Sequence, residues 1–376
     1  MNAPFIFGKI AISDNFIDRQ KDILRLKTNF YSGINTILIS PRRWGKSSLV
    51  EKAGKEVEEE NRGYRVVFID MFNIRSEGDF YKALSERLIK AVSGKFEELV
   101  ENSKKFFKHW IPRISFSPDA QQEFSFGLDW NEVSENPDEI LNMPETISLD
   151  KKLKIIVCID EFQNIGLFEN PLGFQKKLRS HWQHHQNTTY CLFGSKRHML
   201  MEFFASPSMP FYKFGDLMFL DKIETKYWIK FIAEQFEKTG KSISKKNAAK
   251  IALSVENHPY YVQQLAQQVW LRTNKKATEK IIDEALESLI LQLSLLFQSI
   301  TETLSTTQVN FLKALLSNAT KFSSKDTIEK FGLGTSANVV KIKRALISRE
   351  IIDEHNRKIE ILDPVYAKWL KDYYFI

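Results

Sequence analysis

A short apolar run that leads directly into a Gly-Lys-Ser turn constrains this chain more than any other feature. Residues 34–39 form the run, Ser40-Pro41-Arg42-Arg43-Trp44-Gly45-Lys46-Ser47-Ser48 follows it, and helix-patterned sequence continues to residue 60. Strand, loop and helix in this order are the context that a phosphate-binding loop requires. Backbone N–H groups at the helix start would hold phosphate oxygens, Lys46 would add positive charge, and Ser47 would offer a hydroxyl to Mg²⁺.

The loop departs from G-x-x-x-x-G-K-[ST] at one position, because Ser40 stands where the first glycine is expected. Pro41 pushes the preceding residue into an extended conformation that a serine can adopt, so the departure weakens the match without abolishing it. The alternative is a chance Gly-Lys-Ser at an ordinary helix start.

A later apolar strand, residues 154–159, ends in two carboxylates, Asp160 and Glu161. Open α/β sheets bind ligands at the carboxyl ends of their strands. An acidic pair there suits an aspartate that orders Mg²⁺ and a glutamate that activates water, whereas the plainer reading is a solvated strand end. Because both motifs occur in the right order, and each ends an apolar strand, we expect a site for ATP or ADP with Mg²⁺.

Further apolar runs at 66–69 and 189–193 alternate with helical sequence, which indicates a parallel sheet covered on both faces. Residues 108–149 interrupt this rhythm, because 111–116 and 123–128 alternate apolar with polar around Ser117-Pro118-Asp119. That pattern predicts a β-hairpin insertion. We expect the α/β core to span residues 1–215.

After Pro210 the sequence becomes helical, and we expect a helical lid domain over 216–298. Its last helix carries an apolar stripe spaced three and four apart: Leu286, Leu289, Ile290, Leu293, Leu296 and Ile300. Residues 299–376 then predict helices at 306–316, near Asp326 and at 336–347, followed by two short strands at 351–353 and 359–361. Three helices before a two-stranded ribbon are the order of a winged helix.

Composition excludes several classes of protein. The 376 residues are 43% hydrophobic and 27% charged, which is typical of a folded chain rather than a disordered one. Cys158 and Cys191 are too few for a disulfide framework or a four-cysteine metal site. The net charge of +7 permits polyanion binding without demanding it. No stretch approaches 18 uninterrupted apolar residues, so we expect a cytoplasmic protein that does not enter a membrane.

These motifs together resemble P-loop ATPases of the STAND/AAA+ kind, in the group labelled archaeal-type or ATPase-2 proteins, and we expect a bacterial member. The resemblance covers nearly the whole chain and rests on the phosphate loop, Phe16-Ile17-Asp18-Arg19, Asp160-Glu161-Phe162-Gln163, Gly194-Ser195, Pro210-Phe211-Tyr212, Asn257-His258-Pro259-Tyr260-Tyr261 and Asp363-Pro364-Val365-Tyr366-Ala367-Lys368-Trp369-Leu370. It implies an AAA+-like P-loop core, a helical lid and a C-terminal winged helix.

The resemblance also implies roles for single residues. Ile17 and Arg19 would lie near the adenine, Ser195 would contact the γ-phosphate or the attacking water, and Pro259 would bring the lid to the nucleotide. Asn257 tolerates a left-handed backbone and Pro259 suits the first turn of a helix, although a plain helix start is an equal reading.

Within the loop, Pro41, Gly45 and Ser48 are further candidate contacts. Arg42 and Arg43 either reach phosphates or face solvent, and Trp44 packs on the ribose or against the lid.

Two departures from the family pattern bear on hydrolysis. Asp18 stands where glycine is usual, and Lys213-Phe214 replaces the expected Gly-Arg after Tyr212. An ammonium lacks the bidentate fork of an arginine finger, so we expect slow hydrolysis, with Glu161, Lys46 and Ser195 as the catalytic groups.

His181, His184 and His185 share a helix, but no other ligand completes a zinc site, and a polar helix face is the favoured reading. Lys341, Lys343, Arg344 and Arg349 suit DNA phosphates, yet residues 296–376 carry 12 basic and 9 acidic side chains. We therefore expect a nucleotide-dependent switch with a protein partner or self-association and only weak DNA binding. The alternatives are a DNA-binding regulator or loader that uses the winged helix, and an idle nucleotide-bound scaffold.

Overall fold

The protein is described by a computed structural model that covers residues 3–9, 16–94, 96–106, 113–115, 125–127, 137–355 and 358–376. The chain divides into two compact units. The core unit is Arg19–Asp221, and the helical unit combines Met1–Asp18 with Lys222–Ile376. The first residues of the chain therefore group with the lid rather than with the core in which the sequence analysis included them.

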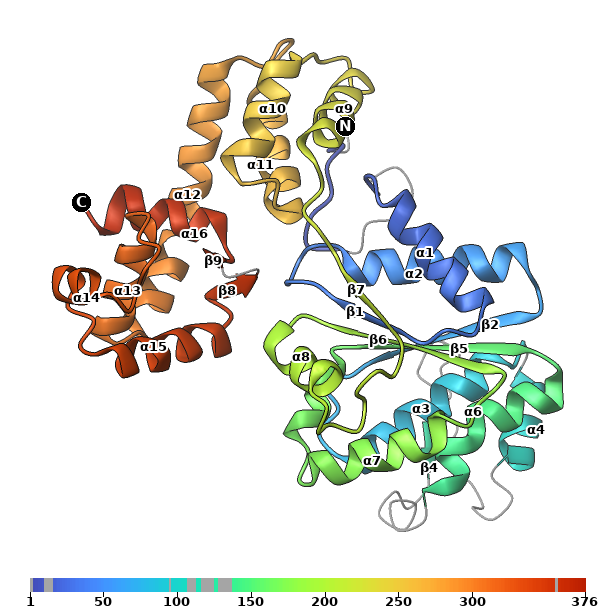
Figure 1. Cartoon of the computed structure of the whole chain (residues 1–376). Coiled ribbons are helices and arrows are strands. Elements are labelled where there is room, and N and C mark those ends of the chain that lie inside the picture. Colours follow the sequence, from blue (N-terminus) through green and yellow to red (C-terminus); the bar gives the residue numbers. More distant parts are fainter. Residues whose placement is uncertain are drawn as a thin grey trace. The chain divides into compact units, whose positions relative to one another are not determined.

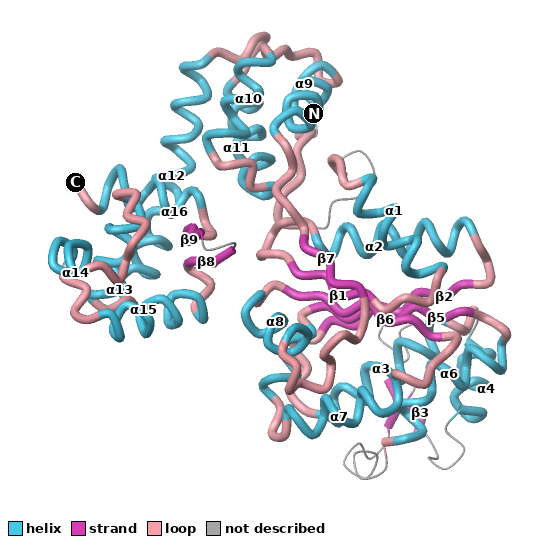
Figure 2. The backbone as a smooth tube through the Cα atoms, viewed as in Figure 1, coloured by secondary structure: helices cyan, strands magenta, loops and turns pink. Residues whose placement is uncertain are grey.

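A five-stranded sheet forms the centre of the core unit. Its strands are β1(Thr36–Ile39), β2(Tyr64–Asp70), β5(Lys154–Asp160), β6(Thr188–Gly194) and β7(Asp216–Phe219), in the order β2-β5-β6-β1-β7. Neighbouring strands all pair in parallel (Figure 2). The predicted parallel sheet is confirmed, and β6 lies between the two strands that carry the sequence motifs.

Helices cover both faces of this sheet (Figure 1). On one face lie α1(Gln20–Tyr31) and α2(Lys46–Glu60), and on the other lie α3(Glu77–Ala91), α6(Asp138–Lys151) and α7(Pro171–Trp182). The remaining elements are α4(Phe96–Phe106), the 3-10 helix η2(Phe162–Leu167) and α8(Arg197–Ala205). Burial on both faces explains why β1 and β6 are continuous apolar runs without alternation.

The segment predicted as a hairpin insertion contains more than a hairpin. β3(Arg113–Ser115) and β4(Ser125–Gly127) pair antiparallel, as the alternation predicts, while the Ser117-Pro118-Asp119 turn lies outside the described residues. However, α6 lies in the same segment and buries Ile140, Leu141 and Ile147 against the core. Pro144 inside this helix obscured its periodicity in the sequence.

Strand β7 also lies beyond the point where the sequence analysis ended the core. It has four residues, pairs with β1 at the edge of the sheet, and buries only Met218 fully. A short, half-buried edge strand leaves a weak apolar signal next to the helical sequence that follows.

The helical unit begins with four lid helices: α9(Thr225–Glu237), α10(Lys245–Ser254), α11(Pro259–Arg272) and α12(Glu279–Glu302). The winged helix follows as α13(Thr306–Leu316), α14(Lys325–Phe331), α15(Ser336–Ser348), β8(Ile352–His355), β9(Lys358–Ile361), α16(Pro364–Trp369) and the π-helix η3(Leu370–Tyr374). The three predicted helices and the two-stranded ribbon are confirmed.

One apolar core runs through the lid helices and the winged helix. The apolar stripe of α12 moves by one residue near its end, because Phe297 is buried against Tyr366 and Trp369 while Leu296 stays exposed. Tyr261 of α11 donates its hydroxyl to Asp363 Oδ2 at 2.5 Å, and Asp363 caps α16. The winged helix therefore packs on its own lid.

The N-terminal residues 3–9 also pack on the lid. Phe5 lies 5.9 Å from the rings of both Phe231 and Phe236, and the backbone N–H of Ile6 donates to Gln263 at 3.0 Å. None of the described helices combines the length and the apolar character that crossing a membrane requires.

Candidate active site

The predicted phosphate loop joins β1 to α2. Gly45 has φ 89°, in the left-handed region that favours glycine, and α2 begins with the next residue, Lys46. Arg43 also has a positive φ of 64°, whereas Ser40 does not. Ser40 is buried and its hydroxyl donates to the Pro41 carbonyl, so a serine fits where the motif has its first glycine.

The loop and the acidic pair meet at the carboxyl ends of β1 and β5. Ser47 donates its hydroxyl to Asp160 Oδ2 at 2.6 Å. Lys46 Nζ lies 3.0 Å from Glu161 Oε1 and 3.7 Å from Asp160 Oδ1. Four candidate residues from two separate motifs thus form one cluster of hydrogen bonds and ion pairs.

Ser195 joins this cluster from the intervening strand, because β6 ends at Gly194. Its hydroxyl donates to Glu161 Oε2 at 3.1 Å and accepts a hydrogen bond from Arg42 Nε at 3.4 Å. The side chain expected to sense the γ-phosphate therefore contacts the expected general base, and Arg42 belongs to the same network.

The pKa values of the two carboxylates shift in opposite directions. Burial raises the pKa of Asp160, although the Lys46 charge and the Ser47 hydroxyl oppose the shift. Burial also acts to raise the pKa of Glu161, but Lys46 and the hydrogen bonds from Gln163 and Ser195 together lower it. Glu161 is therefore held as a carboxylate that can accept a proton.

A left-handed backbone at Glu161 directs its side chain toward Lys46 and Ser195. Its φ of 50° and ψ of 38° are left-handed, an uncommon conformation for a residue with a long side chain, and the chain enters η2 directly afterwards. Asn164 fixes this turn by donating to the carbonyl of Met71 at 3.0 Å. Gln163, a motif residue without an assigned role in the sequence analysis, donates its amide to Glu161 Oε2.

The other predicted contacts are distributed over both units. Pro41 is half-buried, Trp44 and Ser48 are buried, and Arg43 is exposed. Arg19 is buried in the core unit and pairs with Asp22 at 3.3 Å. Ile17 and Pro259 belong to the helical unit, where Ile17 packs on the apolar core.

Pro259 begins α11 after the N-cap residue His258, and the φ of 58° at Asn257 confirms the expected left-handed backbone. The roles proposed for these residues toward a nucleotide stay predictions.

The histidines have polar neighbours of their own. His181 Nε2 lies 3.2 Å from Asp138, and His185 Nδ1 lies 2.8 Å from the hydroxyl of Tyr190. Within the described ranges no three His, Cys, Asp or Glu side chains are grouped as a metal site. The expectation that these histidines hold no structural metal stays a prediction.

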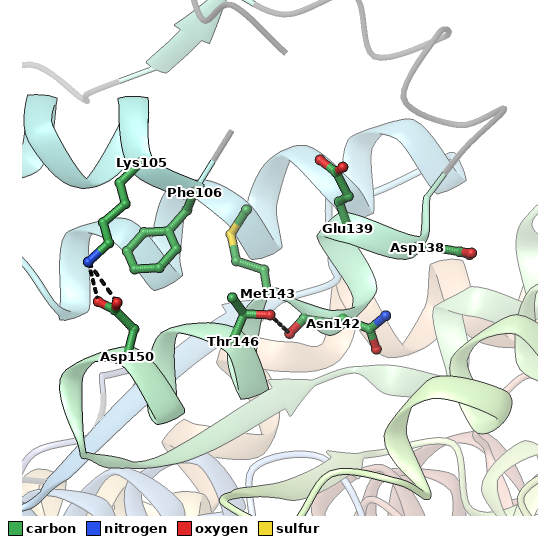
Figure 3. A pocket seen from close by; sticks show the side chains of 8 residues that line it. All are labelled: Lys105, Phe106, Asp138, Glu139, Asn142, Met143, Thr146 and Asp150. Atoms are coloured by element: carbon green, nitrogen blue, oxygen red, sulfur yellow. Dashed lines mark hydrogen bonds and ion pairs between the residues drawn. The ribbon is translucent and has the colours of Figure 1, made fainter. Parts of the chain in front are cut away.

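A separate hollow of about 430 Å³ lies between α4 and α6 (Figure 3). Lys105 and Asp150 pair across it at 2.7 Å, and Thr146 bonds to the Asn142 carbonyl. No predicted site residue lines this hollow, and the polar groups just named already bond to one another. The candidate active site therefore remains the cluster around Lys46 and Glu161.

Two of the four basic residues on or near α15 have partners inside the helical unit. Lys343 pairs with Glu354 at 2.8 Å, and Arg349 donates to the carbonyl of Thr303 at 2.7 Å. Lys341 and Arg344 are exposed. The basic surface of the winged helix is therefore smaller than its sequence suggested.

Sheet order, phosphate loop and terminal domain define the fold as an AAA+-like P-loop ATPase core with a helical lid and a winged helix. Residues 295–372 match a family described as "Probable winged helix domain". The chain is similar to the Walker-type ATPase PABY2304 of Pyrococcus abyssi, with a TM-score of 0.66, 16% identity and coverage of 95% of this chain and 97% of that one.

The chain is also similar to the ORC2 protein of Aeropyrum pernix in ADPNP–ADP complexes, with a TM-score of 0.56, 13% identity and coverage of 95% and 94%. At these identities the likeness concerns the fold alone. A comparison with curated proteins found no match.

Proposed function

We propose that the chain binds ATP or ADP with Mg²⁺ and acts as a nucleotide-dependent switch with slow ATP hydrolysis. The observation that carries this proposal is the cluster in which Lys46 and Ser47 of the loop contact Glu161 and Asp160 of the neighbouring motif. Lys46 provides the counter-charge for the β- and γ-phosphates, and the left-handed Gly45 opens the helix N-terminus toward them.

The residues present fit a magnesium ion. Ser47 Oγ and Asp160 Oδ2, 2.6 Å apart, are hard oxygen donors of the kind that Mg²⁺ prefers. When bound, the ion would neutralise charge on the phosphate oxygens. Asp160 and Ser47 are therefore the proposed ligands.

Hydrolysis uses Glu161 as the general base. Its carboxylate accepts a proton from water as the water oxygen bonds to the γ-phosphorus, and the bond from that phosphorus to the bridging oxygen breaks. The products are ADP and inorganic phosphate, and the proton on Glu161 returns to solvent. Ser195, bonded to the same carboxylate, is proposed to contact the γ-phosphate or the attacking water.

Slow turnover is proposed because no arginine stands at the position where a finger is expected. Lys213 occupies it, exposed, with its ammonium 5.3 Å from the ring of Tyr212. An ammonium is a point charge that cannot match two phosphate oxygens as a guanidinium fork does. The bound nucleotide, rather than rapid turnover, would then set the state of the protein.

We place the protein with STAND ATPases of bacteria, in the cytoplasm, with a protein partner or self-association as its output. The winged helix packs on its own lid, which supports a domain that passes the nucleotide-dependent conformation on to a protein partner rather than one that chiefly binds DNA. A DNA-binding regulator or loader remains the second candidate, because a winged helix is present and Lys341 and Arg344 are exposed.

Two substitutions test binding and hydrolysis separately. Lys46→Ala should lower ATP affinity at least tenfold in calorimetry, since it removes the phosphate counter-charge. Lys27→Ala is the matched control, because Lys27 pairs with Glu56 and Glu60 away from the site. Glu161→Gln should keep ATP binding and lose phosphate release. Equal ATP affinity in Lys46→Ala and the parent would contradict the proposal.

A further inference from the structure

Gln163 is a buried amide placed directly beside the proposed general base. It lies in η2, is 1% exposed, and donates Nε2 to Glu161 Oε2. A carboxylate only accepts hydrogen bonds, so the NH₂ group of the amide must face Glu161 and its carbonyl oxygen must face the other way.

That carbonyl oxygen, Oε1, is buried and has no hydrogen-bond partner within the described part of the chain. An unsatisfied buried acceptor costs stability, and an apolar side chain of the same volume would fill this space without that cost. Packing alone therefore gives no reason for a glutamine here, whereas the bond to Glu161 does.

Gly194 provides the space that the amide occupies. A Cβ on Gly194 would lie 1.9 Å from Gln163 Oε1, far inside van der Waals contact. The φ of Gly194 is not positive, so its backbone conformation does not itself demand glycine. The next residue, Ser195, donates to the same Glu161 oxygen at 3.1 Å.

The two oxygens of Glu161 have different partners. Oε2 accepts from Gln163 and Ser195, while Oε1 contacts Lys46 at 3.0 Å. Lys46 is the residue that the proposed function assigns to the phosphates, and Gln163 has no such second task. The bond from Gln163 to Oε2 is thus independent of where Lys46 points.

We propose that Gln163 is a positioning residue that fixes Glu161 through Oε2 and leaves Oε1 to accept the proton of the attacking water, in a space that Gly194 keeps open. This inference rests on the proposed function, because it requires Glu161 to be the base. Gln163 itself touches neither substrate nor water in this role.

The test replaces Gln163 by a side chain of similar length that cannot donate. Gln163→Met should lower kcat by about 10- to 100-fold, the usual effect of losing an outer partner of a reacting group, and change KM less than about threefold. Affinity for ADP–aluminium fluoride, a transition-state mimic, should fall by a similar factor, while affinity for a non-hydrolysable ATP analogue stays the same.

Gln175→Met is the matched control. Gln175 of α7 is also 1% exposed, and its Oε1 likewise lacks a partner among the described residues. This change therefore removes an equivalent buried amide from a helix that carries no residue of the proposed site. It should leave kcat unchanged. Thermal melting of both variants separates a loss of folded protein from a loss of turnover.

Gly194→Ala provides a second variant, because its methyl group would displace the Gln163 amide. The double change Gly194→Ala/Gln163→Met should lower kcat no further than the larger single effect, since both act through one contact. Glu161-dependent hydrolysis that keeps the parent's kcat in Gln163→Met would overturn this inference alone, as would equal effects of Gln163→Met and Gln175→Met. Absence of ATP binding in the parent would instead overturn the proposed function. ATP binding by the parent without any phosphate release would overturn the proposed hydrolysis together with this inference.

Discussion

His185 makes the stability of the core unit depend on pH. Its imidazole is half-buried three residues beyond the end of α7 at Trp182, with Nδ1 bonded to the Tyr190 hydroxyl and Nε2 3.3 Å from Asn142. The expectation that His184 and His185 share the helix of His181 is therefore wrong. Burial lowers the pKa of His185 from 6.5 to about 4. The carboxylate of Glu145 opposes this shift, and the neighbouring His181 and His184 add to it.

The sign of the effect follows from which state binds the proton. Between about pH 6.5 and pH 4 the unfolded chain protonates His185 and the folded chain does not, so protons favour unfolding. The stabilisation is fully present above pH 6.5 and is lost as the pH falls toward 4. The full shift corresponds to a loss of about 2 kcal/mol between pH 7 and pH 5. Because the ring is partly exposed and screened by solvent, we expect about 1 kcal/mol.

The measurement compares urea denaturation of the parent and of His185→Asn at pH 7 and pH 5. Asparagine does not titrate, so the variant should lose about 1 kcal/mol less of its unfolding free energy over this interval. His184→Asn, at an exposed position of the same segment, is the control and should follow the parent. If His185→Asn and the parent lose the same free energy, the imidazole is not kept neutral by its surroundings and the reasoning is refuted.

Two further predictions concern the helical unit. Tyr261→Phe should destabilise it by about 1–2 kcal/mol in chemical denaturation, because the hydrogen bond to the cap of α16 is lost; an effect no larger than that of Tyr373→Phe, an exposed tyrosine, would contradict this. Duplex DNA should bind weakly and without sequence preference in a salt titration. Submicromolar binding at physiological salt that Lys341→Glu/Arg344→Glu abolishes would instead favour the DNA-binding regulator.

The sequence predicted those strands and helices whose hydrophobic pattern is contained within the element itself. β1, β5 and β6 were recognisable because burial on both faces makes each a continuous apolar run. The winged helix was predicted from the order of three helices before a two-stranded ribbon, and α13 and α15 each bury apolar residues on one face. β7 and α6 were missed, since a short edge strand and a helix with an internal proline give weak patterns.

Some residues of the candidate site could likewise be predicted from the sequence, and others could not. Lys46, Ser47, Asp160 and Glu161 belong to contiguous motifs, so their residue types and positions already indicated their chemistry. The link between Gln163 and Gly194 joins the turn after one strand to the end of another, and nothing in the sequence specifies such a contact. It follows only once β5 and β6 are paired in register.

The order of the strands bears on how the chain folds as it is synthesised. β1 pairs with β6 and β7, which begin only at Thr188 and Asp216, so the strand that carries the phosphate loop leaves the ribosome long before its partners. At about 5–20 residues per second the wait is on the order of 10–40 s. During this interval the apolar β1 has no sheet to join, and we expect nascent chains that end before β6 to depend on chaperones and to have no affinity for nucleotide.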